Sequence, residues 1–350
     1  MKHKLSEVLN RSDDKHRTMD SKNGSKPSEV IVEELKRRSK KSLDLARRTI
    51  LAEKIENQEL REALEYYAQR WCDFTHSGMF SLACEAVGGD PDTAVPVQAA
   101  ITIMAAAFDI QDDIIDNSRT KHKLPTVFGK YGTSVAILLA NAFLIEGFTL
   151  LANHVENLPR RKAAEILGII KKSLFEVGNA HALELNLKRK ANVKPEDYMR
   201  IFKKKAAAIE ADMHIGAILG NGIKEETKAL TEYGRILGLL TQLREEFIDI
   251  FEVEELHHRL RDEYPPIPLL YMMQDAKSKE NIIEILNNKK MENSEAEKLI
   301  EAVFKAKTVR ELKKGMKKLV AESIQSIAEV RRSKAKVLLR KLVTSMLEDL

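Results

Sequence analysis

The stretch Phe108-Asp109-Ile110-Gln111-Asp112-Asp113-Ile114-Ile115-Asp116-Asn117 sets carboxylates and apolar side chains at helical spacing. Asp112 and Asp116 are four residues apart and share one face of a helix, with Asp113 beside them. Like charges so spaced destabilise an isolated helix, and the isoleucines between them predict a buried opposite side. We therefore expect the carboxylates to line a cavity and to bind Mg²⁺, which prefers oxygen ligands. A solvated acidic patch or a helix cap is the alternative for one such motif.

The composition predicts an all-α protein. The 350 residues supply ample material for a large core, while 15 glycines, 9 prolines and 5% aromatic residues argue against a β-rich fold. A net charge of +5 with both signs interleaved gives no reason to expect nucleic-acid binding. Cys72 and Cys84 fit neither a disulfide framework nor a zinc site.

The N-terminus lacks the apolar run of a signal peptide, and no uninterrupted apolar segment is long enough to span a bilayer. We expect a soluble cytoplasmic protein that is not integral to a membrane. Residues 1–50 read as a polar, basic extension, disordered up to Pro27. Its basic cluster, Lys36 to Lys41, is interpreted as a solvated helix face in preference to a membrane-binding patch. Residues 51–350 then form one helical domain.

A second acidic run lies far along the chain. Helical patterns cover 94–116, 134–151, 163–187, 195–219 and 226–251, and a basic loop with Lys121 follows the first of them. The last of these helices contains Gln242-Leu243-Arg244-Glu245-Glu246-Phe247-Ile248-Asp249, which repeats the spacing of the first run. Two such helices facing each other across a bundle would hold a cluster of metal ions between them.

With these motifs in place, the run from Leu82-Ala83-Cys84-Glu85-Ala86-Val87-Gly88-Gly89-Asp90 to Pro125-Thr126 resembles the trans-isoprenyl diphosphate synthase (polyprenyl synthetase) family. The resemblance extends over residues 50–345. It implies an isoprenoid synthase bundle of α-helices around a deep apolar cavity, usually as a homodimer, although a heterodimer is the alternative. It also implies an allylic prenyl diphosphate substrate held by three Mg²⁺ ions, ionised to an allylic cation and attacked by isopentenyl diphosphate.

The resemblance assigns roles to individual residues. A lysine before an alanine run is matched by Lys204, and a glutamine before the second acidic motif by Gln242. The expected catalytic residues are Asp112, Asp113, Asp116, Lys204 and Gln242. The expected Mg²⁺ ligands are Asp112, Asp116, Glu245, Glu246 and Asp249. The expected diphosphate contacts are Lys121, Lys204 and Arg244.

The departures from the family are concentrated where it binds isopentenyl diphosphate. Its G-G-K-R-x-R-P motif falls on the segment Trp71 to Ser77, which has no lysine or arginine. A late family lysine falls on Tyr264. The cationic or imidazole groups expected for the second diphosphate are replaced by Asp73, Phe74, His76, Ala105 and His122. The sequence thus retains the groups that ionise one substrate and lacks those that bind the other.

Three functions agree with this pattern. The favoured expectation is a terpene synthase, which ionises a prenyl diphosphate and allows the cation to cyclise or lose a proton without isopentenyl diphosphate. The second is a prenyltransferase, either a chain elongator or an enzyme with another acceptor. The third is a non-catalytic subunit of a heteromeric synthase. His181 and His214 are interpreted as core histidines.

Overall fold

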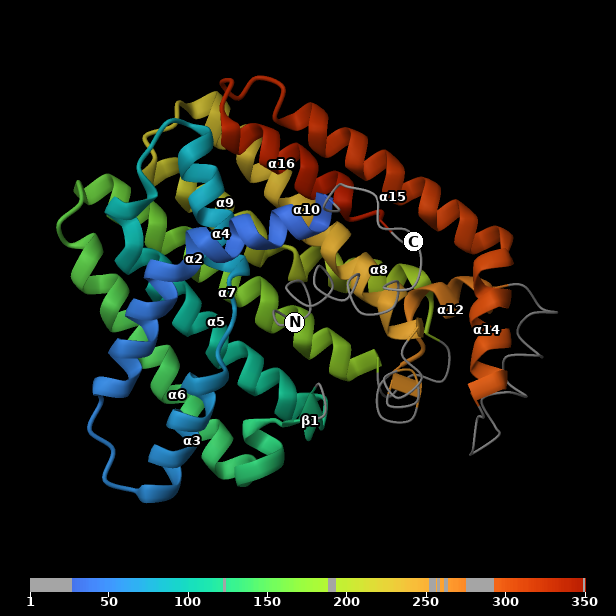
Figure 1. Cartoon of the computed structure of the whole chain (residues 1–350), viewed down its shortest axis with the longest axis horizontal. Helices are drawn as coiled ribbons and strands as arrows, with labels where there is room; N and C mark the ends of the chain where they lie inside the picture. The colour runs from blue at the N-terminus through green and yellow to red at the C-terminus, as the bar shows by residue number, and fades with distance from the viewer. Residues whose placement is uncertain are drawn as a thin grey trace, which may run out of the picture.

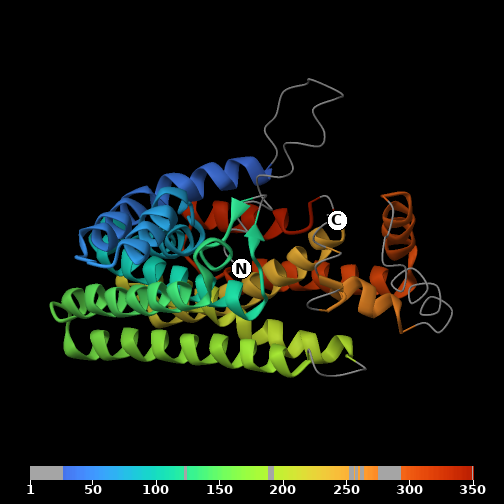
Figure 2. The same ribbon diagram turned by 90° about the horizontal axis from the view of Figure 1, so that it is seen from below.

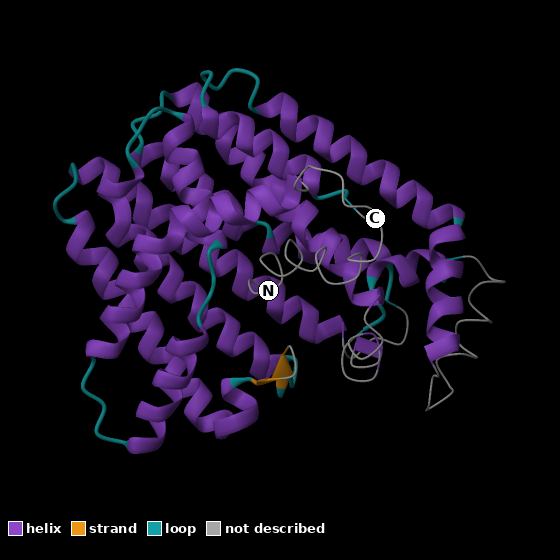
Figure 3. Cartoon of the chain, viewed as in Figure 1, coloured by secondary structure: helices purple, strands orange, loops and turns teal. Residues whose placement is uncertain are grey.

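The computed structural model describes residues 27–121, 124–187, 193–251, 256, 259–260, 264–274, 293–348 and 350. These residues form an all-α bundle, as predicted, with a single two-stranded hairpin between Thr120–Lys121 (β1) and Leu124–Pro125 (β2) (Figure 3). The expected disorder of residues 1–26 and the position of His122 lie outside the described residues. The helices that build the bundle are α2 (Pro27–Ala52), α3 (Gln58–Arg70), α4 (Thr75–Ala86), α5 (Val95–Ile115), α6 (Val127–Val155), α7 (Arg160–Leu187), α8 (Pro195–Lys205), α9 (Ala207–Leu219), α10 (Lys224–Phe251), α12 (Ile267–Met272), α14 (Asn293–Lys305), α15 (Lys307–Ser326) and α16 (Lys334–Ser345).

Helix α5 is the central element of the bundle (Figure 1). It begins with Pro96 in its first turn and consists mainly of alanine, isoleucine and other apolar residues, which are buried on nearly every side. Helix α6 packs closely along it, because Gly147 leaves room for Met104: a Cβ at Gly147 would lie 2.5 Å from the Met104 Cγ. The helix predicted over 94–116 agrees with α5, because the apolar, alanine-rich residues on which the prediction rests are buried around the helix.

Two element boundaries differ from the sequence prediction. The helix expected over 195–219 is divided at Ala206 into α8 and α9. The backbone of α10 approaches this junction, where a Cβ at Gly238 would lie 2.9 Å from the Ala206 Cα. Gly132 breaks α6 near its start with a φ of 80°, a conformation that glycine tolerates, so the regular helix begins close to the predicted Ser134.

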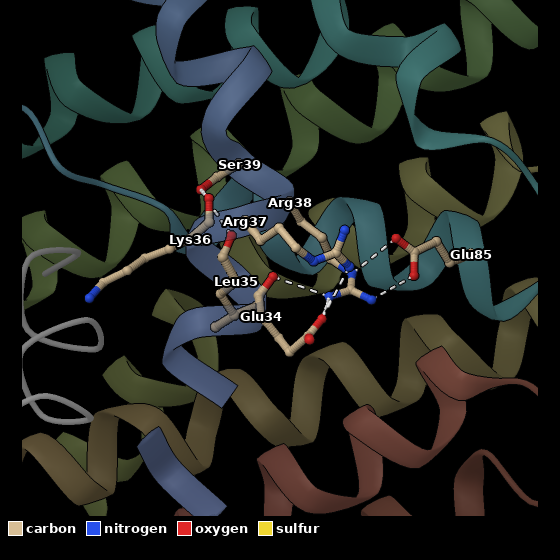
Figure 4. Close-up of polar contacts among 7 residues, drawn as sticks. All are labelled: Glu34, Leu35, Lys36, Arg37, Arg38, Ser39 and Glu85. Atoms are coloured by element: carbon tan, nitrogen blue, oxygen red, sulfur yellow. Dashed lines mark hydrogen bonds and ion pairs between the residues drawn. The ribbon is translucent and has the colours of Figure 1, made fainter. Parts of the chain in front are cut away.

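Residues 27–50 belong to the folded domain, so the predicted boundary at residue 51 is wrong. Ile31, Val32 and Leu35 of α2 are buried in the main core. The Arg38 side chain, 5% exposed, donates to both carboxylate oxygens of Glu85 on α4 at 2.9 and 2.8 Å and also contacts Glu34 (Figure 4). The other members of the basic cluster are more exposed, which agrees with a largely solvated face. Helix α2 thus packs against α4 and covers part of the core.

Two helices are long and apolar enough to cross a membrane by length and composition: Pro91–Ile115, 78% buried in its most apolar window, and Val127–Val155, 33% buried. Both segments contain charged residues, so neither is the uninterrupted apolar run that the sequence was expected to lack. The first segment contains the central helix of the bundle. The second lies with α7 along one side of the molecule (Figure 2). Helices α6 and α7 carry exposed large apolar side chains, called here the α6–α7 surface: Leu138, Ile145, Phe148, Leu167 and Phe175, from 42% to 72% exposed.

We expect Arg38→Ala to lower the free energy of unfolding by about 3 kcal/mol, because it leaves the Glu85 carboxylate without its buried partner. Urea denaturation followed by circular dichroism measures this. The control is Arg37→Ala, whose exposed side chain pairs with Glu34 and should change stability by less than about 0.5 kcal/mol. Equal effects of the two substitutions would show that α2 is not an integral part of the domain.

Candidate active site

A cavity opens between α4, α5, α7 and α9 and encloses roughly 640 Å³, including its mouth. Its walls are mostly apolar, with Ile101, Met104 and Phe108 contributed by α5. Asp109, Asp112 and His181 lie on its lining as well. The predicted deep apolar cavity is therefore present, and the first acidic stretch reaches it. His181, interpreted from the sequence as an ordinary core histidine, lines the cavity instead.

The first acidic cluster forms the last turn of α5 and the residue that ends it. Asp112 and Asp113 are buried, and Asp116 is the half-buried C-cap. The Asp113 carboxylate forms an ion pair with Lys121 on β1, so the loop after α5 returns a cation to the end of the helix. The Asp112 Oδ1 lies 3.4 Å from the His181 Nδ1 on α7. The structure thus brings Lys121 to the acidic cluster, as the sequence predicts.

Charge at this cluster keeps Asp112 ionised. Burial raises the pKa of the Asp112 carboxyl, but His181, Lys205 and Lys121 outweigh it, and the pKa lies well below its usual range. Burial also raises the pKa of Asp113 above its usual value, with Lys121 opposing this shift. The pKa of Lys121 is raised: burial lowers it, but Asp113, Asp112 and Asp109 outweigh that effect. Neutral pH therefore leaves at least one charged carboxylate beside a charged ammonium.

Lys205, not Lys204, reaches this cluster, which corrects the sequence assignment by one residue. The Lys205 Nζ lies 2.6 Å from the Glu184 Oε2, and the side chain is buried, whereas Lys204 is half-buried. Burial lowers the pKa of Lys205, but Glu184, Asp112 and Asp116 outweigh this and raise it. The signal was present in the sequence, because Ile201 and Lys205 are four residues apart and share the buried face of α8.

The second acidic cluster lies on α10. Glu245, Glu246 and Asp249 are all buried, and the Gln242 Nε2 donates to the Glu245 Oε2 at 3.2 Å. Arg259, which sequence reasoning missed, binds both oxygens of Glu246 at 2.9 and 3.1 Å and Asp249 at 2.5 Å. No spacing rule on a helix predicts this contact, because Arg259 follows α10. Its guanidinium supplies a positive charge to the carboxylates expected to bind metal.

Arg244 does not face a diphosphate site, so its assignment is wrong. Its Nη1 donates to the backbone carbonyls of Ser345, Met346 and Glu348 at 3.2, 3.1 and 2.6 Å. These carbonyls lie at the end of α16, where helical carbonyls lack partners within the helix. Arg244 therefore holds the C-terminal helix against α10 and has a structural role.

In the segment aligned with the isopentenyl diphosphate motif, Asp73 has a role in the local backbone structure. The Asp73 Oδ1 accepts a hydrogen bond from the Thr75 N–H at 2.9 Å, and the side chain is only 1% exposed. It therefore turns the chain into α4, in addition to excluding an anion by its charge.

The Tyr264 hydroxyl donates to the Glu184 carbonyl and its ring packs edge-on against Tyr198. Tyr264 thus replaces a cation with a packing contact.

The donor set fits Mg²⁺ in its chemistry, since it consists of carboxylates and one of them is held ionised. Among the described residues, no three acidic, histidine or cysteine side chains converge closely enough to hold one ion by themselves. Mg²⁺ commonly takes one or two protein carboxylates and completes its shell with water and substrate phosphate oxygens. The clusters on α5 and α10 therefore fit ions that a diphosphate completes.

Comparison with known proteins agrees with this geometry. Residues 57–303 match the family model described as polyprenyl synthetase. The chain belongs to the polyprenyl synthetase family. It is 34% identical over 175 residues to a short chain isoprenyl diphosphate synthase of Methanothermobacter thermautotrophicus, covering 50% of this chain and 53% of that relative. It is 28% identical over 233 residues to a geranylgeranyl diphosphate synthase of Methanosarcina mazei, covering 66% and 71%.

Solved structures show the same fold. A geranylgeranyl pyrophosphate synthetase from Pyrococcus horikoshii superposes with a TM-score of 0.81 at 24% identity, covering 92% of this chain and 99% of that one. A polyprenyl synthase from Caulobacter crescentus, complexed with calcium and isoprenyl diphosphate, superposes with a TM-score of 0.76 at 17% identity, covering 94% and 99%. The predicted isoprenoid synthase fold is confirmed.

We expect Lys205→Ala to reduce Mg²⁺-dependent release of pyrophosphate from a prenyl diphosphate by about 100-fold, the effect of removing one charge-stabilising donor from an active site. Lys204→Ala is the matched control and should remain within about threefold of the unsubstituted protein. Steady-state kinetics of pyrophosphate release measures both. A larger loss in Lys204→Ala than in Lys205→Ala would restore the original sequence assignment.

Proposed function

We propose that the chain is a Mg²⁺-dependent prenyltransferase that ionises an allylic prenyl diphosphate and transfers the prenyl group to an acceptor. The observation that carries this proposal is the position of Asp112 on the lining of an apolar cavity, with the Asp113–Lys121 ion pair next to it in the last turn of α5. The relatives named above are prenyl diphosphate synthases. They favour group transfer and give no support to the expected terpene synthase, which this proposal replaces.

The reaction follows from the placement of charge and hydrocarbon. Bound Mg²⁺ would neutralise the diphosphate and stabilise it as a leaving group, and Asp112, Asp116, Glu245, Glu246 and Asp249 would be its ligands. Lys121 and Lys205 add two positive charges next to the departing anion. The cavity walls accommodate the prenyl chain and keep water away from the cation. Gln242, which contacts Glu245, orients that ligand.

The retained charges argue against a non-catalytic subunit. Asp112 and the Asp113–Lys121 pair are buried beside a cavity, where unneeded charges cost several kcal/mol each without contributing to packing. A subunit that does not bind the diphosphate would gain nothing from these destabilising buried charges. We therefore assign the ionisation step to this chain itself.

Geranyl, farnesyl, geranylgeranyl and geranylfarnesyl diphosphates, each incubated with the protein and Mg²⁺, test the ionisation step. We expect pyrophosphate release from at least one of them that disappears with EDTA and falls 100-fold or more in Asp112→Asn, because a metal ligand is lost. The control, Asp92→Asn, removes an exposed carboxylate elsewhere and should have no effect. Asp112→Asn activity within threefold of the unsubstituted protein would refute the metal site.

We also propose that two copies of the chain associate through the α6–α7 surface. Ile145 and Phe175 are 68% and 72% exposed, which is unusual for such large apolar side chains in a monomer. The same patch on a second copy would cover them around a twofold axis.

Sedimentation equilibrium should give twice the mass of one chain for the protein, and the mass of one chain for the double variant Ile145→Lys, Phe175→Lys. Val337→Lys, at an exposed apolar position on α16, is the control and should remain a dimer. A chain that is monomeric before any substitution and associates only with a different synthase would support a heterodimer instead.

A further inference from the structure

A buried polar pair lies on the wall of the cavity, on helices other than the two that carry the acidic clusters. His76 of α4 and Asp212 of α9 both line the cavity, and their side chains are only 4% and 2% exposed. The His76 Nδ1 lies 2.5 Å from the Asp212 Oδ2. Their surroundings on the lining are chiefly apolar, including Met104 and Ile215.

A hydrocarbon chain gives this pair nothing to bind. Burying a carboxylate and an imidazole costs several kcal/mol unless other groups compensate, and a wall that served only a prenyl chain would be apolar throughout. The pair places one ring nitrogen, Nδ1, against Asp212. Among the described residues, the other ring nitrogen, Nε2, has no polar partner. A ligand in the cavity is therefore its natural partner.

A carboxylate beside one nitrogen of an imidazole is the arrangement that prepares the other nitrogen to accept a proton. The pair shares the cavity with Ala105, which precedes Asp112 by seven residues, two helical turns or about 10 Å along α5. Because His76 and Asp112 line the same cavity, an acceptor bound beside His76 would share that cavity with the prenyl diphosphate.

We propose that His76, oriented by Asp212, is the base that accepts the proton of a hydroxyl acceptor during prenyl transfer. This inference rests on the proposed prenyltransferase function and names its acceptor class: an uncharged alcohol, with water as the smallest member. Among the described residues that line the cavity there is no lysine or arginine to bind a second diphosphate. Asp212 instead gives this region a carboxylate, which disfavours an anionic acceptor.

The step is balanced in atoms and electrons. The bond between the prenyl C1 and the bridging diphosphate oxygen breaks, and its electron pair leaves with the diphosphate. A lone pair of the acceptor oxygen forms the new bond to C1, and the hydroxyl proton passes to the His76 Nε2. The products are a prenyl ether, or a prenyl alcohol when water is the acceptor, together with pyrophosphate.

One labelled substrate tests the proposal. The prenyl diphosphate with the fastest turnover is prepared with ¹⁸O in the bridging position and incubated with the protein, Mg²⁺ and ethanol in ordinary water. If the allylic cation forms and recombines with pyrophosphate, the label moves to non-bridging positions in the recovered substrate. If ethanol or water reacts with the cation instead, the products are a prenyl ethyl ether and a prenyl alcohol, both without ¹⁸O. Hydrolysis at phosphorus by a contaminant would leave ¹⁸O in the alcohol, so the two routes are separated.

We expect His76→Gln to scramble label within about twofold of the unsubstituted protein but to form ether and unlabelled alcohol about 100-fold more slowly. Asp212→Asn should lower capture in the same way, because the ring loses its orientation. Thr102→Ala, a buried substitution on α5 whose hydroxyl bonds only the Gln98 carbonyl, should leave both rates unchanged.

The outcomes separate this inference from the proposed function. If the label scrambles and His76→Gln forms ether and alcohol as fast as the unsubstituted protein, the role of His76 is overturned. Scrambling with transfer to isopentenyl diphosphate but never to water or ethanol would overturn the acceptor class and leave the prenyltransferase proposal intact. Absence of scrambling in the unsubstituted protein with all four prenyl diphosphates would overturn the proposed function as well.

Discussion

The ion pairs around Asp112 and Asp113 are the interaction on which the mouth of the cavity depends. These carboxylates lie in the last turn of a buried helix, where the backbone dipole already places negative charge. Lys121 from the following hairpin and Lys205 from the end of α8 offset the negative charge of the carboxylates and that of the helix dipole. Two segments far apart in the sequence must therefore meet at one helix end. Their meeting also concentrates charge at the place where a prenyl diphosphate would be ionised.

The two acidic clusters differ in what balances their charge. Lysines lie beside the cluster on α5, whereas Arg259 binds two of the carboxylates on α10 directly. The guanidinium of Arg259 binds carboxylate oxygens that a metal ion would also use, although it carries one positive charge and Mg²⁺ carries two. Metal binding through these same oxygens would therefore move Arg259, and its positive charge would then be available to the diphosphate. Exchange of one cation for another would couple substrate binding to the segment after α10.

Much of the fold was predictable, because helical periodicity and the alanine-rich character of α5 are local properties of the sequence. The position of Lys121 near the acidic cluster was predictable for the same reason, because the basic loop that contains it directly follows the helix. The choice of Lys204 over Lys205 could have been corrected from helical periodicity, whereas the other errors involve contacts between distant segments. Lys204 and Lys205 differ only in the face of α8 on which they lie, and that face is defined by packing of Tyr198 and Ile201 in the core.

Arg244, Arg259 and His76 illustrate the same limit. Arg244 is adjacent to the second acidic motif, yet the end of α16 provides its partners. Arg259 and the His76–Asp212 pair depend on segments that meet only in the folded chain. The alignment puts His76 where the family has an arginine, which shows that this cation is absent from the site. It gave no indication of Asp212, which is 136 residues away and determines what the cavity contains instead.

A structure of the protein with Mg²⁺ and an unreactive sulfur-bridged analogue of its prenyl diphosphate tests the central claim most directly. The account predicts a diphosphate at the end of α5, with metal ions that contact Asp112 on one side and carboxylates of α10 on the other. It also predicts that Arg259 has left Glu246 and Asp249, and that Lys205 contacts the diphosphate. A diphosphate bound elsewhere, or Arg259 still paired with both carboxylates beside a bound analogue, would contradict it.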